Sequence, residues 1–221
     1  MGQKENRKTA TVKLPLHPTK KTRSLDVLTG KEITIEEKKV YKIILADPAW
    51  RFETWSDKGK GRGPEQHYAT MSLDEIKKLP VGDLADDDCV LFLWATSPML
   101  EKAFEVIRAW GFEYKCLAFT WVKRNTDGSM FKGLGFYTRS NAELCLLATK
   151  GKPKRVSCDV DQVLVTKRRE HSRKPDEIRK KIVELYGDVQ RIELFARQRF
   201  EGWDVWGLQA PSLIQKLLKE E

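Results

Sequence analysis

The stretch "YKIILADPAW" (residues 41–50) decides how the chain is expected to fold. Its apolar run from Ile43 to Ala46 does not alternate with polar residues, which is typical of a strand in a sheet covered on both faces. The run ends at Asp47, and a proline and Trp50 follow closely. An acid in this place belongs either to a structural turn or to a reaction site, and the rest of the sequence must decide between them.

Short apolar runs alternate with amphipathic segments from residue 40 onward. Besides residues 41–46, the runs predicted as strands are "CVLFLWA" (89–95), "CLAFTWV" (116–122), "ELCLLAT" (143–149), "QVLVT" (162–166) and "RIELFA" (191–196). The segments predicted as helices are "SLDEIKKL" (72–79), "TSPMLEKAFEVIRAWG" (96–111) and "KPDEIRKKIVELYG" (174–187). This alternation predicts an α/β domain with a mainly parallel sheet and helices on both faces of it.

The predicted helices carry start and stop signals. The first has Ser72 and Glu75 at the spacing of a capping box. The second has Ser97 as its predicted N-cap, with a proline at the first helical position and a glycine at the end. The third begins near Pro175 and is expected to end at Gly187.

The length of 221 residues favours one domain at residues 26–221, preceded by a basic and flexible arm at residues 1–25. The 41 Lys and Arg residues exceed the 32 Asp and Glu residues, so the formal net charge is +9. A basic balance favours an anionic partner, and a nucleic acid is the leading specific interpretation. A solvated basic surface without a ligand is the alternative.

The four cysteines, at positions 89, 116, 145 and 158, do not form a pair with the spacing of metal ligands. We expect reduced, buried thiols in a cytoplasmic protein, and no metal site. The first thirty residues lack the apolar core of a signal peptide. No apolar run approaches the roughly 20 residues that span a membrane, so no membrane partner is expected.

Two connections are longer than plain turns. Residues 51–70 hold three glycines and leave the carboxyl end of the first predicted strand, and residues 123–143 leave another strand end. Open α/β sheets bind their ligands outside the carboxyl ends of the strands. Long connections in compact domains are often lids or binding loops, so both segments are candidates for that role.

The order Asp47, Pro48, Trp50 suits one particular reaction. An exocyclic amino group on a nucleobase is a poor nucleophile because its lone pair is delocalised into the ring. A carboxylate and a carbonyl that each accept one N–H bond draw the nitrogen towards tetrahedral geometry. Asp47 supplies the first acceptor, the carbonyl of Pro48 is the predicted second, and Trp50 is the predicted stacking face for a base taken out of its strand.

Several further blocks resemble one family when they are read in order. They are "ADPAW" (46–50), "HYATMSLDEI" (67–76), "LFLWATSPML" (91–100), "TWVKR" (120–124), "GFYTRSNAELCLLATKGKP" (135–153), "HSRKPDEI" (171–178) and "RIELFAR" (191–197). With them the chain resembles the short bacterial and phage-type members of the MT-A70 family of S-adenosylmethionine-dependent adenine-N6 methyltransferases. The resemblance implies a Rossmann-like methyltransferase domain in the permuted order, with the catalytic strand first and the donor-binding strand near the end.

The resemblance also assigns residues to the methyl donor. Asp47 faces it, Arg197 contacts its ribose, and Arg199 and Gln209 belong to the same site. Some relatives hold the donor carboxylate with a lysine where this chain has Ala142, and Arg139 is assigned as its substitute. The chain departs from the family pattern at Ala49, where a second proline is usual, and at Leu208, where an asparagine is usual.

The predicted substrate contacts are Trp50, Tyr68 beside the adenine, and Lys123 at the mouth of the site. A solvated Lys123 and a packed Tyr68 are the alternatives. Lys167, Arg168 and Arg169 lie in a basic stretch that is expected to follow backbone phosphates, with a solvated face as the alternative. His171 is a weaker candidate for touching the donor or the substrate.

The sequence therefore predicts an adenine-N6 methyltransferase that acts on DNA with S-adenosylmethionine. An RNA adenine-N6 methyltransferase is one alternative, and an inactive nucleic-acid-binding partner subunit is another. A cytosine-N4 methyltransferase usually has serine in place of the acid. A homodimer and a heterodimer are both compatible with the sequence.

Overall fold

The structure is a computed structural model. It describes residues 40–51, 70–133, 135, 137–169 and 173–207, together with the backbone of two strands at Thr19–Leu25 and Glu32–Lys38. Tyr68, His171, Gln209 and Leu208 lie outside the described residues, as does most of the predicted binding loop at 51–70.

A seven-stranded sheet forms the centre of the domain, with the strand order β7-β5-β6-β4-β3-β8-β9. Its strands are β3 (Tyr41–Ala46), β4 (Ala85–Ala95), β5 (Glu113–Arg124), β6 (Ala142–Lys150), β7 (Val163–Lys167), β8 (Arg191–Leu194) and β9 (Asp204–Trp206). Strand β6 runs antiparallel to both of its neighbours, and all the other neighbouring pairs are parallel. The sheet is therefore mixed, with a single reversed strand.

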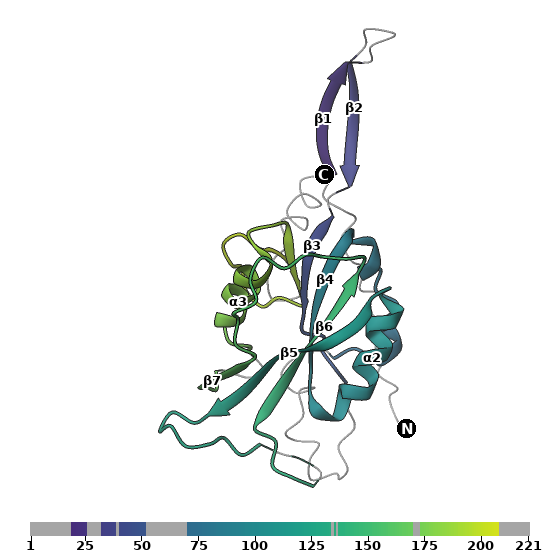
Figure 1. The fold of residues 1–221 in the computed structure, drawn as a ribbon. Coiled ribbons are helices and arrows are strands. Elements are labelled where there is room, and N and C mark those ends of the chain that lie inside the picture. Colours follow the sequence, from purple (N-terminus) through teal and green to yellow (C-terminus); the bar gives the residue numbers. More distant parts are fainter. Residues whose placement is uncertain are drawn as a thin grey trace, which may run out of the picture.

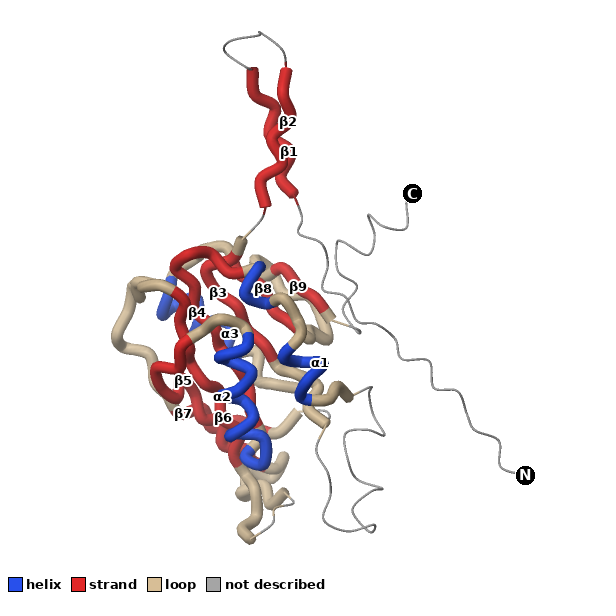
Figure 2. The backbone as a smooth tube through the Cα atoms, turned by 90° about the vertical axis from the view of Figure 1, so that its right-hand side faces the viewer, coloured by secondary structure: helices blue, strands red, loops and turns tan. Residues whose placement is uncertain are grey.

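Helices cover both faces of this sheet, as Figures 1 and 2 show. The face that carries α1 (Leu73–Lys77) and α2 (Leu100–Ala109) packs Ile44, Leu91 and Leu93 against the apolar sides of these helices. The opposite face packs the alternate strand residues against α3 (Glu177–Tyr186). Successive residues of a strand point to opposite faces of the sheet, so a strand that is buried on both faces is apolar throughout. This explains the continuous apolar run of β3.

The helix signals give mixed results. The capping box is confirmed, because the Ser72 hydroxyl accepts from the amide of Glu75 while the Glu75 carboxylate accepts from the amide of Ser72. The prediction that Ser97 caps α2 is wrong: Ser97–Met99 form a separate 3₁₀ turn, and α2 begins after Met99. The proline at position 98 is compatible with this tighter turn because its missing N–H is not needed there.

Residues Thr19–Leu25 were expected to belong to the arm, and instead they form β1. This strand pairs antiparallel with β2 (Glu32–Lys38) in a two-stranded hairpin. Figures 1 and 2 show the hairpin projecting away from the central sheet. Residues 1–18 lie outside the described residues, so the division of the chain into arm and domain stays a prediction.

All four cysteines are free. Cys89 and Cys145 are buried as predicted, whereas Cys116 and Cys158 are exposed. The prediction of burial is wrong for Cys116 because the first half of β5 extends beyond the covered part of the sheet. None of the helices in the described part of the chain combines the length and apolarity needed to cross a bilayer.

Candidate active site

Asp47 lies at the carboxyl end of a central strand. The preceding residue, Ala46, pairs with Leu93 of β4 on one side and with Leu194 of β8 on the other. Strands β3, β4 and β8 are parallel, so their carboxyl ends meet at one edge of the sheet. This is the edge where open α/β sheets bind ligands, and it favours a reaction site over a simple turn.

The residues after Asp47 form a tight turn that is tied to the start of α1. The carbonyl of Pro48 accepts the amide N–H of Trp50 at 2.8 Å, and the carbonyl of Ala49 accepts that of Met71 at 2.8 Å. The amide of Arg51 in turn donates to the carbonyl of Met71 at 3.1 Å. These bonds fix the path of the chain at the strand tip. A carbonyl has two lone pairs, so that of Pro48 keeps one for a ligand.

The structure corrects the role expected of Trp50. Its side chain is buried, with only 4% of its surface exposed, and it packs in the apolar cluster on the α1 and α2 face. The indole Nε1 donates to the carbonyl of Trp94 at 3.1 Å. A buried indole needs such an acceptor, and here the backbone at the tip of β4 supplies it. Trp50 therefore stabilises the turn and does not present an open stacking face.

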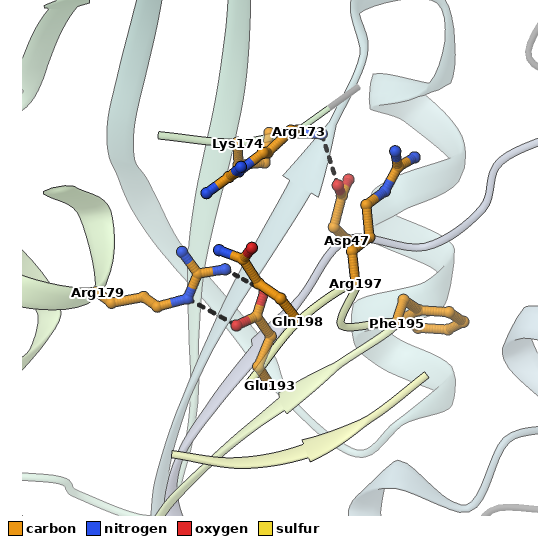
Figure 3. Close-up of a pocket in the computed structure, with 8 residues that line it drawn as sticks. All are labelled: Asp47, Arg173, Lys174, Arg179, Glu193, Phe195, Arg197 and Gln198. Carbon is orange, nitrogen blue, oxygen red and sulfur yellow. Dashed lines mark hydrogen bonds and ion pairs between the residues drawn. The ribbon is translucent and has the colours of Figure 1, made fainter. Parts of the chain in front are cut away.

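A pocket opens beside Asp47, between the tips of β3 and β8 and the segment that leads into α3. Its empty space is about 350 Å³, a volume that includes the part open to solvent. Four cations, two carboxylates, one amide and one aromatic ring line it: Asp47, Arg173, Lys174, Arg179, Glu193, Phe195, Arg197 and Gln198 (Figure 3). A pocket with so many convergent charges is the default candidate for a ligand site.

Lys174 is a central residue of the site that sequence reasoning did not select. Its Nζ lies 2.7 Å from Oδ2 of Asp47 and 3.1 Å from Oε2 of Glu143, and its side chain is only 9% exposed. The ring of Trp94 lies 5.5 Å from the same nitrogen. Its membership of the block "HSRKPDEI" was the available signal, but the block gives no partner for the lysine.

The buried charges shift one another's proton affinities. Burial raises the pKa of Asp47, although the ammonium of Lys174 opposes this effect. Burial alone would also raise the pKa of Glu143, but Lys174 and Lys123 reverse the effect and hold it below its usual value. For Lys174, the two carboxylates outweigh burial and raise its pKa, so this lysine stays charged.

A second buried ion pair forms the opposite wall of the pocket. Arg179 of α3 donates to both oxygens of Glu193 on β8, from Nε at 2.7 Å and from Nη2 at 2.6 Å. Its guanidinium also lies 3.5 Å from the centre of the Phe200 ring. Burial raises the pKa of Glu193 even though Arg179 opposes that effect. The pair joins α3 to the sheet and fixes the Glu193 carboxylate at the pocket.

The residues predicted to hold the donor are only partly brought together. Arg197 lines the pocket, and its contact with the donor ribose stays a prediction. Arg199 is exposed and does not line it, and Arg139 is exposed on the connection between β5 and β6. Gln209 lies outside the described residues. Phe195, two residues before Arg197, adopts a left-handed conformation at φ 63°, so the chain turns directly after β8.

The expected role of Lys123 is corrected as well. It lies neither at the mouth as a phosphate contact nor in solvent. Its ammonium forms an ion pair with Glu143, and its side chain is 18% exposed. Because a buried cation is stable only when it is paired, Lys123 serves here as the outer partner of the Glu143 carboxylate.

The three residues of the predicted phosphate track differ from one another. Lys167, at the end of the edge strand β7, and Arg168 are exposed, and the guanidinium of Arg168 lies 5.3 Å from the centre of the Phe131 ring. Arg169 instead forms ion pairs with Asp176 and Glu177 at the start of α3. Its charge is therefore largely neutralised, so the structure removes Arg169 from the track.

Comparison with known proteins finds one family. The model of the MT-A70 family matches residues 41–209, which contain the whole sheet and the site. The Type II methyltransferase M.MunI of Mycoplasma sp is 35% identical over 191 residues, which are 79% of each chain. The human N(6)-adenosine-methyltransferase catalytic subunit METTL3 is 32% identical over 160 residues, 71% of this chain but only 26% of that protein. The N(6)-adenosine-methyltransferase MT-A70-like protein of Drosophila melanogaster is 32% identical over 160 residues, which are 71% of this chain and 24% of that protein.

Proposed function

Because the chain belongs to the MT-A70 family, whose methyltransferases use S-adenosylmethionine, we propose that it transfers a methyl group to N6 of adenine in DNA. One observation carries the proposal. The Asp47 carboxylate and the Pro48 carbonyl follow the central strand β3 directly, at the carboxyl edge of the sheet, and a charged pocket opens beside Asp47. A Rossmann-like domain in the permuted order is part of the proposal, since β3 precedes β8 in the chain.

The pocket residues suit the donor. The carboxylate of Glu193, held by Arg179, keeps lone pairs that can accept hydrogen bonds from hydroxyl groups of the donor. Arg197 lines the same pocket and can face the ribose or the carboxylate of the donor. The Nε of Arg173 is buried and has no hydrogen-bond partner among the described residues, which matches a place for an acceptor oxygen. When bound, S-adenosylmethionine supplies a methyl group on a sulfonium centre.

The protein would act on the amino group that receives the methyl. Asp47 accepts one N–H of adenine N6 and the carbonyl of Pro48 accepts the other, so that the nitrogen lone pair is directed away from the ring. Acceptors that are already in place need no reorganisation during the reaction. The surplus proton leaves to Asp47 or to water after transfer. Arg168 and Lys167 would follow the phosphates of the substrate.

DNA is favoured over RNA because the chain matches the Type II methyltransferase M.MunI over 79% of both chains, whereas its match to the N(6)-adenosine-methyltransferases named above covers only about a quarter of their length. An RNA substrate is the outcome that would replace DNA in the proposal.

The proposal is tested with donor that carries a tritiated methyl group. The protein is incubated with DNA and with RNA of matched sequence, each nucleic acid is digested, and the labelled nucleoside is identified by chromatography and mass spectrometry. We expect N6-methyldeoxyadenosine from DNA, and a rate of labelling about 10²–10³ lower with the Asp47→Ala variant. Label in N4-methylcytosine, in RNA alone, or in neither nucleic acid would contradict the proposal.

A further inference from the structure

A row of four charges of alternating sign, each at most one quarter exposed, begins at Asp47. Asp47 pairs with Lys174, Lys174 pairs with Glu143, and Glu143 pairs with Lys123. The four side chains are 25%, 9%, 11% and 18% exposed in this order, so the row is most deeply buried in its middle. We name these residues the charge row.

The members come from elements that differ in rigidity. Glu143 lies on β6, which pairs with β4 and β5 on its two sides, and its position is therefore fixed by the sheet. Lys174 lies in the segment before α3 and reaches the site with a long, flexible side chain. The buried Pro175 follows it and restrains the backbone, but the side chain needs an anchor of its own.

The two carboxylates share one ammonium group. Lys174 bonds Oδ2 of Asp47 and Oε2 of Glu143, while Oε1 of Glu143 is taken by Lys123. Lys174 already lies 2.7 Å from Oδ2 of Asp47, and its second bond, to Glu143, keeps the ammonium on that side of the carboxylate. With Glu143 absent, the ammonium would be free to move across both oxygens of Asp47. It would then occupy the oxygen that has to accept the N–H bond of the substrate.

We propose that Glu143 is a positioning residue for methyl transfer, which holds Lys174 so that Asp47 stays available to the substrate amino group. Lys123 is the counter-charge that lets this carboxylate stay ionised inside the domain. The inference rests on the proposed function, since it assigns the same role to Asp47. Glu143 and Lys123 do not touch the substrate, but they set the charge and the availability of Asp47, which does.

The charges that face Asp47 predict opposite shifts for two variants. They are Lys174 before α3, Glu143 and the Cys145 thiol on β6, Glu193 on β8 and Arg197 after it. Glu143→Gln removes a like charge, so the pKa of Asp47 falls. Lys174→Met removes the opposite charge, so the pKa of Asp47 rises. Both shifts follow from charge alone, so the loss of kcat in Glu143→Gln at a pH where Asp47 is ionised is the result that a merely structural role for Glu143 does not predict.

The experiment measures transfer to DNA against pH and, separately, the titration of the Asp47 carboxyl carbon by NMR. We expect Glu143→Gln to move the acid limb of the kcat profile down by about one pH unit and to lower kcat roughly 10- to 100-fold. Lys174→Met should move the limb up by at least as much, and Lys123→Gln up by less. Glu105→Gln makes the same change of charge in the partly exposed pair with Lys77 and should move nothing.

An unchanged kcat of Glu143→Gln at neutral pH, shifts of Glu143→Gln and Lys174→Met in the same direction, or an unmoved titration of Asp47 in both would overturn the inference. The NMR titration does not need activity, so the two proposals can fail separately. Opposite shifts of Asp47 in a protein that methylates neither nucleic acid would keep the charge row and remove the proposed function. If Glu143→Gln does not fold, Lys123→Gln carries the test, and an unshifted titration there would contradict the inference.

Discussion

The two faces of the central sheet are built from different chemistry. On the face of α1 and α2, the cluster of buried side chains is apolar, and its ion pair between Lys77 and Glu105 lies at the partly exposed rim. On the face of α3, the apolar cluster lies beside the buried charges of Lys174 and Arg179. Buried charges are costly unless they are paired, so their concentration on one face marks the face that serves a function rather than stability alone.

The largest effect is expected from breaking the buried pair on the α3 face. Arg179→Met leaves the Glu193 carboxylate buried without its partner, and should lower the free energy of unfolding by about 3–5 kcal/mol. Lys77→Met breaks a pair on the other face whose side chains are 32% and 40% exposed, and should cost about 0–1 kcal/mol. Urea unfolding of both variants measures the difference. Equal losses would mean that the two faces do not differ in this respect.

The next effect separates activity from stability. Asp47→Ala should lower the rate of methyl transfer by about 10²–10³, because it removes an acceptor that acts mainly in the transition state. It should lower the free energy of unfolding less than Arg179→Met does, because Lys174 keeps Glu143 as a partner. Ile107→Val on the other face should do the reverse, with a loss of about 0.5–1.5 kcal/mol in stability and normal transfer. Single-turnover rates and thermal unfolding of both variants decide the matter. A stable Asp47→Ala protein with normal rates would remove Asp47 from the mechanism.

The activity of the wild type should also depend on pH in a defined direction. Asp47 must be ionised to accept the N–H bond, and burial raises its pKa above the ordinary value of 3.8. Activity should therefore be present at neutral pH and be lost as pH falls through this raised pKa, above the usual range of an aspartate. An acid limb at or below 3.8 would show that Asp47 is not the titrating group or is not buried in solution.

A smaller effect concerns the surface charges near β7. Replacing Lys167 and Arg168 with alanine should flatten the plot of log affinity for DNA against log salt by about 1.8 units, since each contact contributes about 0.9. Arg169→Ala should change the slope little because Asp176 and Glu177 already pair with it. Fluorescence titrations at several salt concentrations give the slopes. A larger change from Arg169→Ala than from the double variant would restore Arg169 to the phosphate track.

The smallest effect is expected at the boundary between the faces. Ala49 separates Asp47, which lines the pocket, from Trp50, which packs in the apolar cluster. The turn uses the carbonyls of Pro48 and Ala49 and the amide of Trp50, so a proline at position 49 removes none of these bonds. Ala49→Pro should keep activity and change stability by about 1 kcal/mol or less. A marked loss would show that residue 49 needs its N–H or another φ angle.

The strands were predictable because double burial leaves a strong mark in the sequence. All six predicted strands occur, and β3 has the predicted bounds of Tyr41–Ala46. Strand β9 was missed because three half-buried residues at the edge of a sheet give no periodic pattern. The first residues of β4 were missed because Asp86, Asp87 and Asp88 are acidic and lie outside the covered part of the strand.

The site was predictable only where its residues are adjacent in sequence. Asp47 and Pro48 form one motif, but Lys174 lies 127 residues from its partner Asp47, and no local pattern joins them. The burial of Trp50 depends on the carbonyl of Trp94, which only the pairing of β3 with β4 brings near. Charges such as Lys123 and Arg169 look alike in sequence whether they meet a phosphate or a carboxylate, so their partners decide their role.

The two ends of the connection between residues 51 and 70 are joined to each other, which affects how much length this connection can accept. Residues 50 and 71 form a parallel bridge, and Arg51 donates to the hydroxyl and carbonyl of Thr70, so both ends of residues 52–69 are fastened to the domain. The entropy of closing a loop grows slowly, by only about 0.6 kcal/mol for each doubling of its length. Insertions between these ends would therefore cost the fold little, and the catalytic turn at the strand tip would keep its hydrogen bonds.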